Sequence, residues 1–477
     1  MIGKIAARFS SLPSAALYAL SAAIEKSFSF ITIPLMAAFL SPAEYGNYDI
    51  AVVAADLVVL VVGLGMAEQL IRFASTADSD IEKRRIAGEI LGCAVIAAAV
   101  FLAFVLAISG YYASLINLQL DIVAFRIVLC GACLSALIEL PLAWLRLQDD
   151  AYDFLRFVVV RTLCQVSAIV FVLSSGYGAA GLLVANGIIM GASTLWLVSQ
   201  QIGKTPILFS YDRYRQLLHY GLPVLGAMLC MYALGNASRL FLGNGVSAEE
   251  VGNFGLATRF AMILAFALYP LELWWLPKRI AALKSPEGLE LSARIFGIGA
   301  GLLLLAAMGV CLLIPIFIQE LFPSGYTDAI KFLPWLTLIV GLGAIAGMLE
   351  VGSYAREHGY RVMAIDFVAA SAAVIGFVVL IPLWGVYGAM VAMGIAQTLR
   401  ISGYLRDGLE LAPINYPWRS CLFCFALVGS AIAMVPAEAS ALVRLGWAFG
   451  SYVLLLVAMF STGLVDWPLR LDLLRQD

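Results

Sequence analysis

Three cations, Lys26, Arg239 and Arg259, lie inside long apolar segments of this chain. A charge at that depth of a membrane costs at least about 2.5–3.5 kcal/mol, so each one needs a reason. Arg239 shares a helix face with Tyr232 and Asn236, because the three residues are spaced i, i+4 and i+7. A guanidinium suits phosphate through bidentate hydrogen bonds, and a lysine ammonium acts as a point charge. These five residues form a candidate site for an anionic, phosphate-bearing substrate.

Two carboxylates in the same segments are candidates for binding a coupling ion. Glu25 lies about twelve residues from the inner end of the first segment, on the order of 18 Å at 1.5 Å per residue and so near the midplane. Asp56 lies seven residues after Asp49 and shares its helix face. Alternatively, Glu25 or Asp56 simply pairs with Lys26 or Arg259 to lower the cost of burial. For the group as a whole, a hydrated cavity is favoured.

Charges near the ends of the segments have simpler explanations. Three arginines lie within a turn or two of a predicted helix end, and their long side chains can reach water: Arg126, Arg161 and Arg400. Three glutamates lie near inner ends, where pairing with a loop arginine or lysine is expected: Glu68, Glu139 and Glu350.

No catalytic, metal or cofactor site is expected. The eight cysteines all fall inside apolar stretches, two pairs with C-x-x-C spacing, and the chain has only two histidines. Small residues facing the core or the lipid explain these cysteines better than a metal or redox centre. No predicted loop is long enough for a soluble catalytic domain. We therefore expect neither an enzyme nor a nucleic-acid-binding protein.

The elements that hold these residues are apolar helices. Hydrophobic residues make up 62% of the 477 residues and charged residues 13%, against about 45–50% and about 25% in soluble domains. Apolar runs of roughly the 20 residues that a membrane-spanning helix needs recur along the chain. The sequence predicts an all-α polytopic membrane protein with 14 transmembrane helices, at about 14–40, 47–70, 90–109, 122–145, 157–175, 179–200, 217–241, 252–276, 294–317, 330–352, 362–382, 386–402, 419–437 and 444–464.

A duplication organises these helices. The segment 41–48 (SPAEYGNY) reappears 206 positions later as 247–254 (SAEEVGNF), keeping the serine, a glutamate, the glycine, the asparagine and an aromatic residue. A second match, offset by 207, relates six residues of 178–188 to 385–395. Each copy has six spans, so the two repeats are parallel, and such bundles usually rock against each other around a central site. We predict an N-terminal six-helix lobe (1–205), a C-terminal six-helix lobe (206–408) and an additional two-helix segment (409–477).

The two copies are not equivalent in their charges. At the repeat offset, Lys26 corresponds to Tyr232, Arg239 to Ile33, and Asp56 to Met262. Helix packing alone would tolerate equivalent residues. Cations spread over both copies are expected where an anionic substrate is held between them.

Basic residues predict the orientation. If the N-terminus is cytoplasmic, 21 of the 29 lysines and arginines fall in inner segments, two (Lys331 and Arg444) in outer segments and six within spans. This asymmetry follows the positive-inside rule. Both termini are therefore predicted to be cytoplasmic.

The junction of the first two helices resembles a family signature. The stretch 39–48 (FLSPAEYGNY) is similar to the L-x-P-E-E-Y-G-x-Y pattern of bacterial polysaccharide exporters. These are the O-antigen and exopolysaccharide repeat-unit flippases of the multidrug/oligosaccharidyl-lipid/polysaccharide superfamily. The stretch 385–389 (GVYGA) also resembles a pattern found late in such proteins. The resemblance covers the whole chain in span order and duplication, and fourteen spans resemble the lipid II flippase branch.

This resemblance implies a flippase that moves an undecaprenyl-pyrophosphate-linked oligosaccharide from the cytoplasmic to the periplasmic leaflet of the inner membrane by alternating access. The product would serve O-antigen, capsule or exopolysaccharide biosynthesis. It also implies that basic residues of the first, second, seventh and eighth helices hold the pyrophosphate, and Lys26, Arg239 and Arg259 match these positions. The second helix departs from the pattern, because it carries acidic Asp56. Implied partners are the lipid-linked oligosaccharide, membrane lipids and the polysaccharide polymerase or export machinery.

Three alternatives stay open. A multidrug-and-toxin extrusion exporter would share the fold. Its cavity should be acidic to hold organic cations, and Asp56 and Glu25 are compatible with this alternative. A major-facilitator transporter would share parallel repeats, but the 71–89 loop lacks that family's glycine-and-basic signature. A polymerase or ligase of lipid-linked sugars would need catalytic residues on outer loops, which carry little beyond a few carboxylates.

Overall fold

The computed structural model describes residues 13–354, 359–411, 413–435 and 440–465. Within these ranges, the side chains of Ala15, Lys26, Ser27, Ser29, Phe30, Ile31, Gly359 and Leu409 are not described. The described residues are almost entirely helical and contain no strand. By compactness the chain divides into two units, Met1–Gly252 and Asn253–Asp477.

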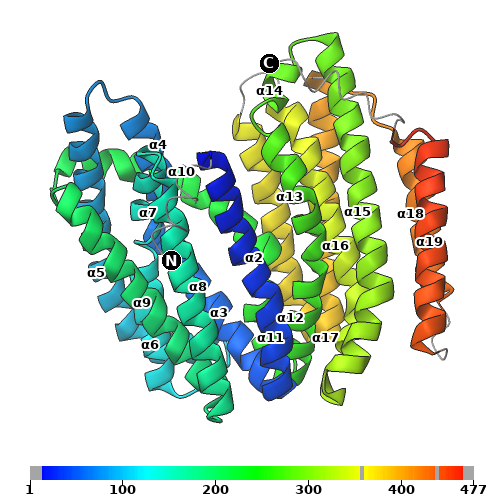
Figure 1. Cartoon of the computed structure of the whole chain (residues 1–477), viewed down its shortest axis with the longest axis horizontal. Helices are drawn as coiled ribbons and strands as arrows, with labels where there is room; N and C mark the ends of the chain where they lie inside the picture. The colour runs from blue at the N-terminus through cyan, green and yellow to red at the C-terminus, as the bar shows by residue number, and fades with distance from the viewer. Residues whose placement is uncertain (1–12, 355–358, 412, 436–439, 466–477) are drawn as a thin grey trace, which may run out of the picture. The chain divides into compact units, whose positions relative to one another are not determined.

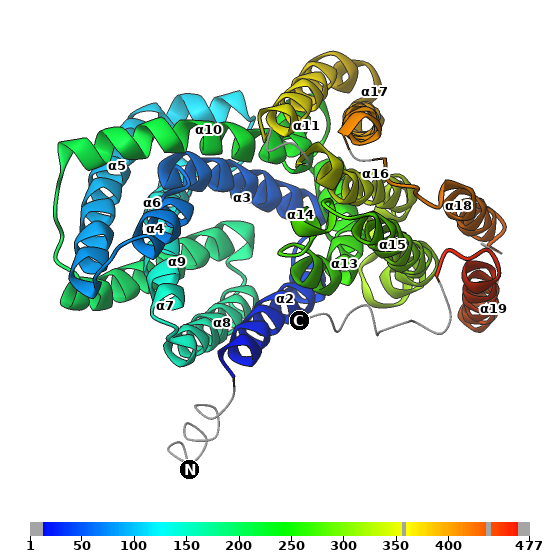
Figure 2. The same cartoon turned by 90° about the horizontal axis from the view of Figure 1, so that it is seen from above.

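The first unit holds the first seven spans (Figure 1). Its helices are α2 (Ser14–Phe39), α3 (Pro42–Gly63), α4 (Met66–Ser75), α5 (Asp80–Leu115), α6 (Ile122–Ser135), α7 (Glu139–Leu147), α8 (Ala151–Ser174), α9 (Gly178–Lys204), α10 (Tyr211–Gly235) and α11 (Ser238–Gly245). The strongest packing is of α6 on α9 and of α2 on α8. Helix α10 runs beside α3 and α5, so span seven lies against this unit (Figure 2).

The second unit begins inside α12 (Ala248–Ala261). It continues through α13 (Ile263–Trp275), α14 (Arg279–Ala282), α15 (Pro286–Leu321), η1 (Ser324–Tyr326), α16 (Ala329–Leu349), η2 (Glu350–Tyr354), α17 (Gly359–Leu411), α18 (Trp418–Ala433) and α19 (Ala441–Ser461). The predicted lobe boundary at 205/206 concerns the duplication of the sequence and stays a prediction.

The predicted class, an all-α polytopic membrane protein, is confirmed. Eleven helices among the described residues are long and apolar enough to cross a membrane, and two shorter apolar helices are Ala16–Glu25 and Trp418–Ala433. One of the eleven, Tyr360–Gly408, covers two predicted spans and is broken at Gly385, whose φ of 55° and ψ of −131° are not helical. The count of fourteen spans stays a prediction.

The repeated eight-residue segment builds the same corner twice. Ser41 and Glu44 form a capping box at the start of α3, with the Ser41 hydroxyl accepting from Glu44 N and the Glu44 carboxylate accepting from Ser41 N. Ser247 and Glu250 exchange the same two hydrogen bonds at the start of α12. Two orphan backbone donors are satisfied in each copy, which fixes where the helix begins.

The repeated asparagine fastens the loop that precedes the fourth span of each copy. Asn47 Oδ1 accepts from Gln119 N at 3.2 Å, and Asn253 Oδ1 accepts from Ala329 N at 3.1 Å. Both asparagines are at least nine-tenths buried. The duplicated residues are therefore explained by helix starts and loop attachment, which are structural roles.

The repeated glycine marks a close approach of backbones. A Cβ on Gly46 would lie 2.0 Å from Ala248 O, and a Cβ on Gly252 would lie 1.9 Å from Pro42 O. Both distances are far below van der Waals contact, so neither position has room for a side chain. The relation is reciprocal, as expected for equivalent residues of a duplicated unit.

The second sequence match also has one local structure in both copies. Gly178 and Gly385 each have a positive φ, 59° and 55°. Glycine adopts this region without strain. Gly178 begins α9, and Gly385 begins the second half of α17.

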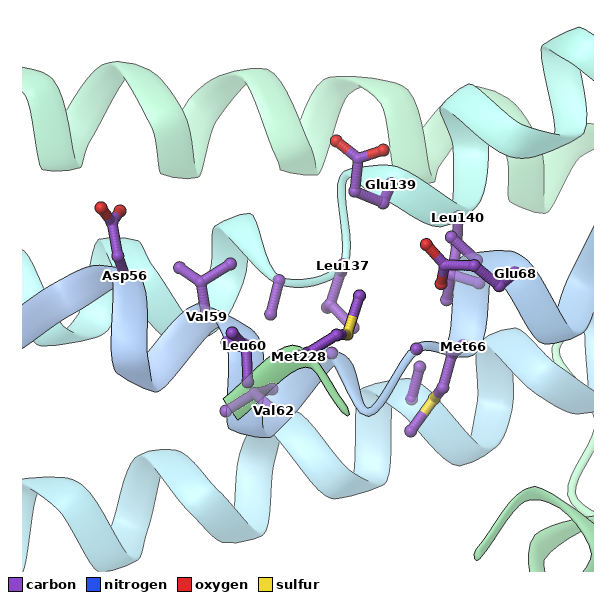
Figure 3. Close-up of a pocket in the computed structure, with 15 residues that line it drawn as sticks. Asp56, Val59, Leu60, Val62, Met66, Glu68, Leu137, Glu139, Leu140 and Met228 are labelled. Carbon is purple, nitrogen blue, oxygen red and sulfur yellow. The ribbon is translucent and has the colours of Figure 1, made fainter. Parts of the chain in front are cut away.

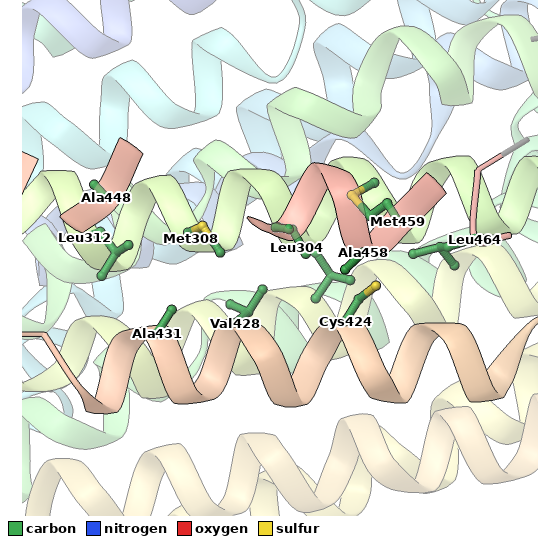
Figure 4. Close-up of a cluster of buried hydrophobic side chains, with 11 residues drawn as sticks. Leu304, Met308, Leu312, Cys424, Val428, Ala431, Ala448, Ala458, Met459 and Leu464 are labelled. Atoms are coloured by element: carbon green, nitrogen blue, oxygen red, sulfur yellow. The ribbon is translucent and has the colours of Figure 1, made fainter. Parts of the chain in front are cut away.

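The additional C-terminal helices pack on the second unit through an apolar core (Figure 4). The buried side chains come from α15, α18 and α19: Leu304, Met308, Leu312, Cys424, Val428, Ala431, Ala448, Leu455, Ala458 and Met459. The hydroxyl of Tyr452 in α19 donates to Leu305 O in α15 at 3.0 Å. The two helices are thus attached chiefly by van der Waals packing, as is usual between helices in lipid.

Candidate functional site

Span seven is broken where three of the predicted site residues lie. Helix α10 ends at Gly235 with Asn236 as its C-cap, and α11 begins at Ser238. The break turns Arg239 toward α3. Its Nη1 donates to Asn236 Oδ1 at 3.1 Å.

Arg239 is paired with Asp49 inside the first unit. Arg239 Nε lies 2.8 Å from Asp49 Oδ2, and the two side chains are only 5% and 4% exposed. These two atoms lack the alignment of a hydrogen bond. The sequence placed Asp49 on a helix face with Asp56 but did not predict its partner. In this conformation the charge of Arg239 is neutralised by the protein itself.

Tyr232 is also joined to α3. Its buried hydroxyl donates to Val53 O at 2.7 Å. Asp49, Val53 and Asp56 are spaced i, i+4 and i+7 along α3 and face the same side of that helix. The structure therefore brings Tyr232, Asn236 and Arg239 together on one face of α3.

The three arginines expected to reach water all have protein partners, although Arg126 is also exposed. Arg161 pairs with Glu25. This agrees with the alternative in which Glu25 is part of an ion pair, although the sequence did not name Arg161 as the partner. Arg126 Nε donates to Ser109 Oγ at 3.0 Å. Arg400 is 4% exposed and its Nε donates to Asp366 Oδ1 at 2.7 Å. The expectation for Arg400 was wrong, because the helix continues eleven residues beyond it.

Two of the three glutamates near inner ends pair as expected. Glu139 Oε2 accepts from Arg146 Nη2 at 3.3 Å, and Glu350 Oε1 lies 3.7 Å from Arg279 Nη2. Glu139 also lies within electrostatic range of Glu25, Arg161 and Glu68. The inner half of this unit therefore holds several carboxylates near two arginines.

A cavity of about 260 Å³ opens in the first unit, where spans two and four both break (Figure 3). Span two breaks at Leu64 and Gly65, which have φ of 45° and 61°. Span four breaks between Ser135 and Glu139. Neither break was predicted from the sequence, although the Gly-Leu-Gly run at 63–65 is a signal for the first.

Three carboxylates line this cavity among mostly apolar residues: Asp56, Glu68 and Glu139. Glu68 and Glu139 are in the first turns of α4 and α7, where the partial positive charge of a helix N-terminus favours a carboxylate. Among the described residues that line it, none is a lysine or arginine. This cavity suits a cation better than a phosphate.

The other two predicted cations, Lys26 and Arg259, lie in α2 and α12. Lys26 lies in α2, but its side chain is outside the described residues. Arg259 lies in α12 in the second unit and is half-buried. Asp366, which was not predicted from the sequence as a site residue, accepts hydrogen bonds from Arg400 and Tyr404 in the same unit. A signal existed, because Asp366 and Arg400 are opposite charges within two consecutive predicted spans.

Comparisons with known proteins agree with this architecture. A family model described as polysaccharide biosynthesis protein matches residues 11–272. No curated protein matches the chain in sequence. The fold is similar to the lipid II flippase MurJ in an inward closed conformation, with a TM-score of 0.71 at 13% identity over 96% of this chain and 100% of that chain.

The fold is also similar to a multidrug resistance MATE family transporter of the MOP superfamily. Its inward-facing structure has a TM-score of 0.65 at 16% identity over 81% of this chain and 94% of that chain. Its outward-facing structure has a TM-score of 0.53 at 16% identity over 84% of this chain and 96% of that chain. The helices described above therefore form a MurJ- and MATE-like membrane fold.

Proposed function

Because the chain belongs to the polysaccharide biosynthesis protein family, we propose that it is a flippase that carries an undecaprenyl-pyrophosphate-linked oligosaccharide across the membrane. The oligosaccharide is a repeat unit of O-antigen, capsule or exopolysaccharide, and transport occurs by alternating access. The family and the fold are those of transporters. The proposal adds the substrate and the direction, from the cytoplasmic to the periplasmic leaflet of the inner membrane.

One observation carries this proposal: the family match is joined to a MurJ-like fold over 96% of the chain. The inward-facing MATE match covers 81%. The two matches differ in how many residues of this chain they cover, and that difference is similar to the length of the additional segment 409–477. The whole chain, with its additional helices, is thus better matched by a protein named as a lipid II flippase than by a multidrug transporter.

We propose that Lys26, Arg239 and Arg259 bind the pyrophosphate, with Asn236 and Tyr232 as polar neighbours. Arg239 can bind the pyrophosphate only when its pair with Asp49 is open. A guanidinium that is neutralised in a buried ion pair attracts an anion only weakly.

Asp56 and Glu25 are the proposed sites of the coupling ion. Asp56 lines the cavity of the first unit, whereas Glu25 is joined to Arg161. A carboxylate that lines a cavity can exchange a proton or sodium ion with water, which supports Asp56 as a candidate.

We further propose that both termini are cytoplasmic and that the flipped product passes to a polysaccharide polymerase or export machinery. The distribution of lysine and arginine supports the orientation. Cysteine accessibility at residues 204 and 331, which lie on opposite sides in this topology, would test it.

Alanine substitution tests the site. Lys26→Ala and Arg259→Ala should each abolish surface polysaccharide in a complemented deletion strain while leaving the amount of protein in the membrane normal. Lys284→Ala, a matched loss of charge in a predicted inner loop, should leave polymer output unchanged. Wild-type output from both site variants would refute the assignment.

A second candidate function is export of organic cations. It is favoured by the acidic lining of the cavity at Asp56, Glu68 and Glu139. A dye-efflux assay in a susceptible host separates the two functions: efflux that depends on Asp56 together with normal surface polysaccharide in the deletion strain would favour the exporter.

A further inference from the structure

Beside the cavity, the first unit holds a group of charges that the proposed pyrophosphate site does not use. Arg161 of α8 pairs with Glu25 of α2, and Glu139 of α7 accepts from Arg146 Nη2 at 3.3 Å. Glu139 also lies within electrostatic range of Glu25 and Arg161. Two ion pairs from three helices therefore lie close together. We call Glu25, Glu139, Arg146 and Arg161 the mixed-charge cluster.

Much of this cluster lies well inside the membrane and is still exposed. Arg161 lies ten residues after the start of α8, and Glu25 eleven residues after the start of α2. At 1.5 Å per residue, both are on the order of 15 Å from the predicted inner ends. The side chains of Glu25 and Glu139 are nevertheless 51% and 57% exposed. A carboxylate exposed at such a depth faces water rather than hydrocarbon, so the cluster borders an aqueous space.

The composition of the cluster indicates the class of ligand that it suits. A cation is held by acceptors and a phosphate by donors. The cluster offers both, because carboxylates only accept hydrogen bonds and guanidinium groups only donate them. A sugar hydroxyl donates one hydrogen bond and accepts others. A neutral ligand rich in hydroxyls can therefore bind to both kinds of group at once.

Gln165 extends the cluster along α8. It lies one turn after Arg161 on the same face, and its Nε2 donates to Asn186 Oδ1 of α9 at 3.3 Å. A carboxamide is both donor and acceptor, as a hydroxyl is. Arg161 also has a donor to offer, because its Nε makes no hydrogen bond within the part of the chain that the structure describes.

We propose that Glu139, Arg161 and Gln165 form a saccharide-binding subsite within the first unit, which holds a neutral, hydroxyl-rich sugar of the lipid-linked oligosaccharide. Glu25 orients Arg161 through their ion pair, and Arg146 does the same for Glu139. The inference rests on the proposed function, because it assigns residues to the part of that substrate that the proposed cations do not bind. The subsite recognises the sugar and contributes nothing to binding of the pyrophosphate.

Binding of two lipids to the purified full chain tests the subsite. The probes are undecaprenyl pyrophosphate and the same lipid carrying the host strain's repeat unit, extracted from cells that lack the polysaccharide polymerase. The native chain should bind the linked oligosaccharide at least about tenfold more tightly than the bare lipid. Glu139→Leu and Gln165→Leu should each weaken binding of the linked oligosaccharide about tenfold, because each removes hydrogen bonds to hydroxyls. Both variants should leave the Kd of undecaprenyl pyrophosphate unchanged.

Glu290→Leu is the matched control. Glu290 is also an exposed glutamate paired with an arginine, Arg294, but it lies in α15 of the second unit. Its replacement should leave the Kd of both lipids unchanged. Gln165→Leu removes no charge, so it keeps the test decisive if Glu139→Leu lowers the yield of folded protein.

The outcomes separate this inference from the proposed function. Equal binding of the two lipids by the native chain, or equal weakening of both by Glu139→Leu, would overturn the subsite and leave the flippase standing. Loss of tetraphenylphosphonium binding in Glu139→Leu, with the linked oligosaccharide unaffected, would show that the cluster holds a cation and would also overturn the subsite. Binding of neither lipid by the native chain would overturn the proposed function and the subsite with it.

Discussion

Each compact unit contains a buried aspartate–arginine pair, and the two pairs differ in what surrounds them. Asp366 Oδ1 accepts aligned hydrogen bonds from Arg400 Nε and from the Tyr404 hydroxyl, both at 2.7 Å. Arg239 Nε lies at a similar distance from Asp49 Oδ2, 2.8 Å, without alignment. Distance and burial alone would make the pairs equivalent.

The difference follows from what each pair joins. Asp366 and Arg400 lie 34 residues apart in the two halves of α17, which fold against each other as neighbours. Asp49 and Arg239 lie 190 residues apart in α3 and α11. A satisfied buried network rigidifies the elements it joins. We therefore interpret the Asp366 network as a brace within α17. We expect the Asp49–Arg239 pair, which lacks an aligned hydrogen bond between Nε and Oδ2, to stabilise the fold less.

The largest expected effect is on folding. Arg400→Met leaves Asp366 buried without its arginine and should cost about 3–5 kcal/mol, enough to remove most folded protein. Arg239→Met should cost less, because Arg239 Nε makes no aligned hydrogen bond to Asp49 Oδ2. Folded yield from membranes, measured by size exclusion in detergent, compares the two.

Replacing both partners sharpens this test. Asp366→Leu with Arg400→Met should recover much of the folded yield, because an apolar pair removes the uncompensated charge. Equal losses from Arg400→Met and Arg239→Met would show that both pairs are braces and would break the comparison.

A smaller effect is expected from the two buried tyrosine hydroxyls. Tyr404 donates to a carboxylate, whereas Tyr232 donates to the Val53 carbonyl. Hydrogen bonds to charged groups contribute about 1.5–3 kcal/mol and neutral ones about 0.5–1.5 kcal/mol. Tyr404→Phe should therefore lower the free energy of unfolding more than Tyr232→Phe. Thermal unfolding in detergent measures both, and a larger loss from Tyr232→Phe would contradict the assignment.

Local and periodic features were predictable from the sequence. Hydrophobic runs predicted the membrane helices, and the repeated serine, glutamate and asparagine marked two corners that the structure builds alike. Such features depend on residues a few positions apart. The ion pair of Glu139 with Arg146, seven residues apart, belongs to the same class.

Contacts between distant helices were not predictable. The sequence placed Arg239 with Tyr232 and Asn236 but could not show which face of which helix they meet, because that depends on packing between spans. Arg400 was misjudged for a related reason: its helix was expected to end at about residue 402 but continues to Leu411. The cavity at Asp56 forms where spans two and four break. Only the break in span two has a signal in the sequence, the glycines at 63 and 65.

The smallest expected effect concerns the two capping boxes, which should behave alike. Ser41→Ala and Ser247→Ala each remove the hydroxyl that accepts from the backbone of the following glutamate. Each should lower the free energy of unfolding by about 1 kcal/mol. Because the corners have one geometry, the two losses should agree, as measured by denaturant unfolding in detergent. Unequal losses would indicate that the two copies of the repeated segment differ in stability, although their capping hydrogen bonds match.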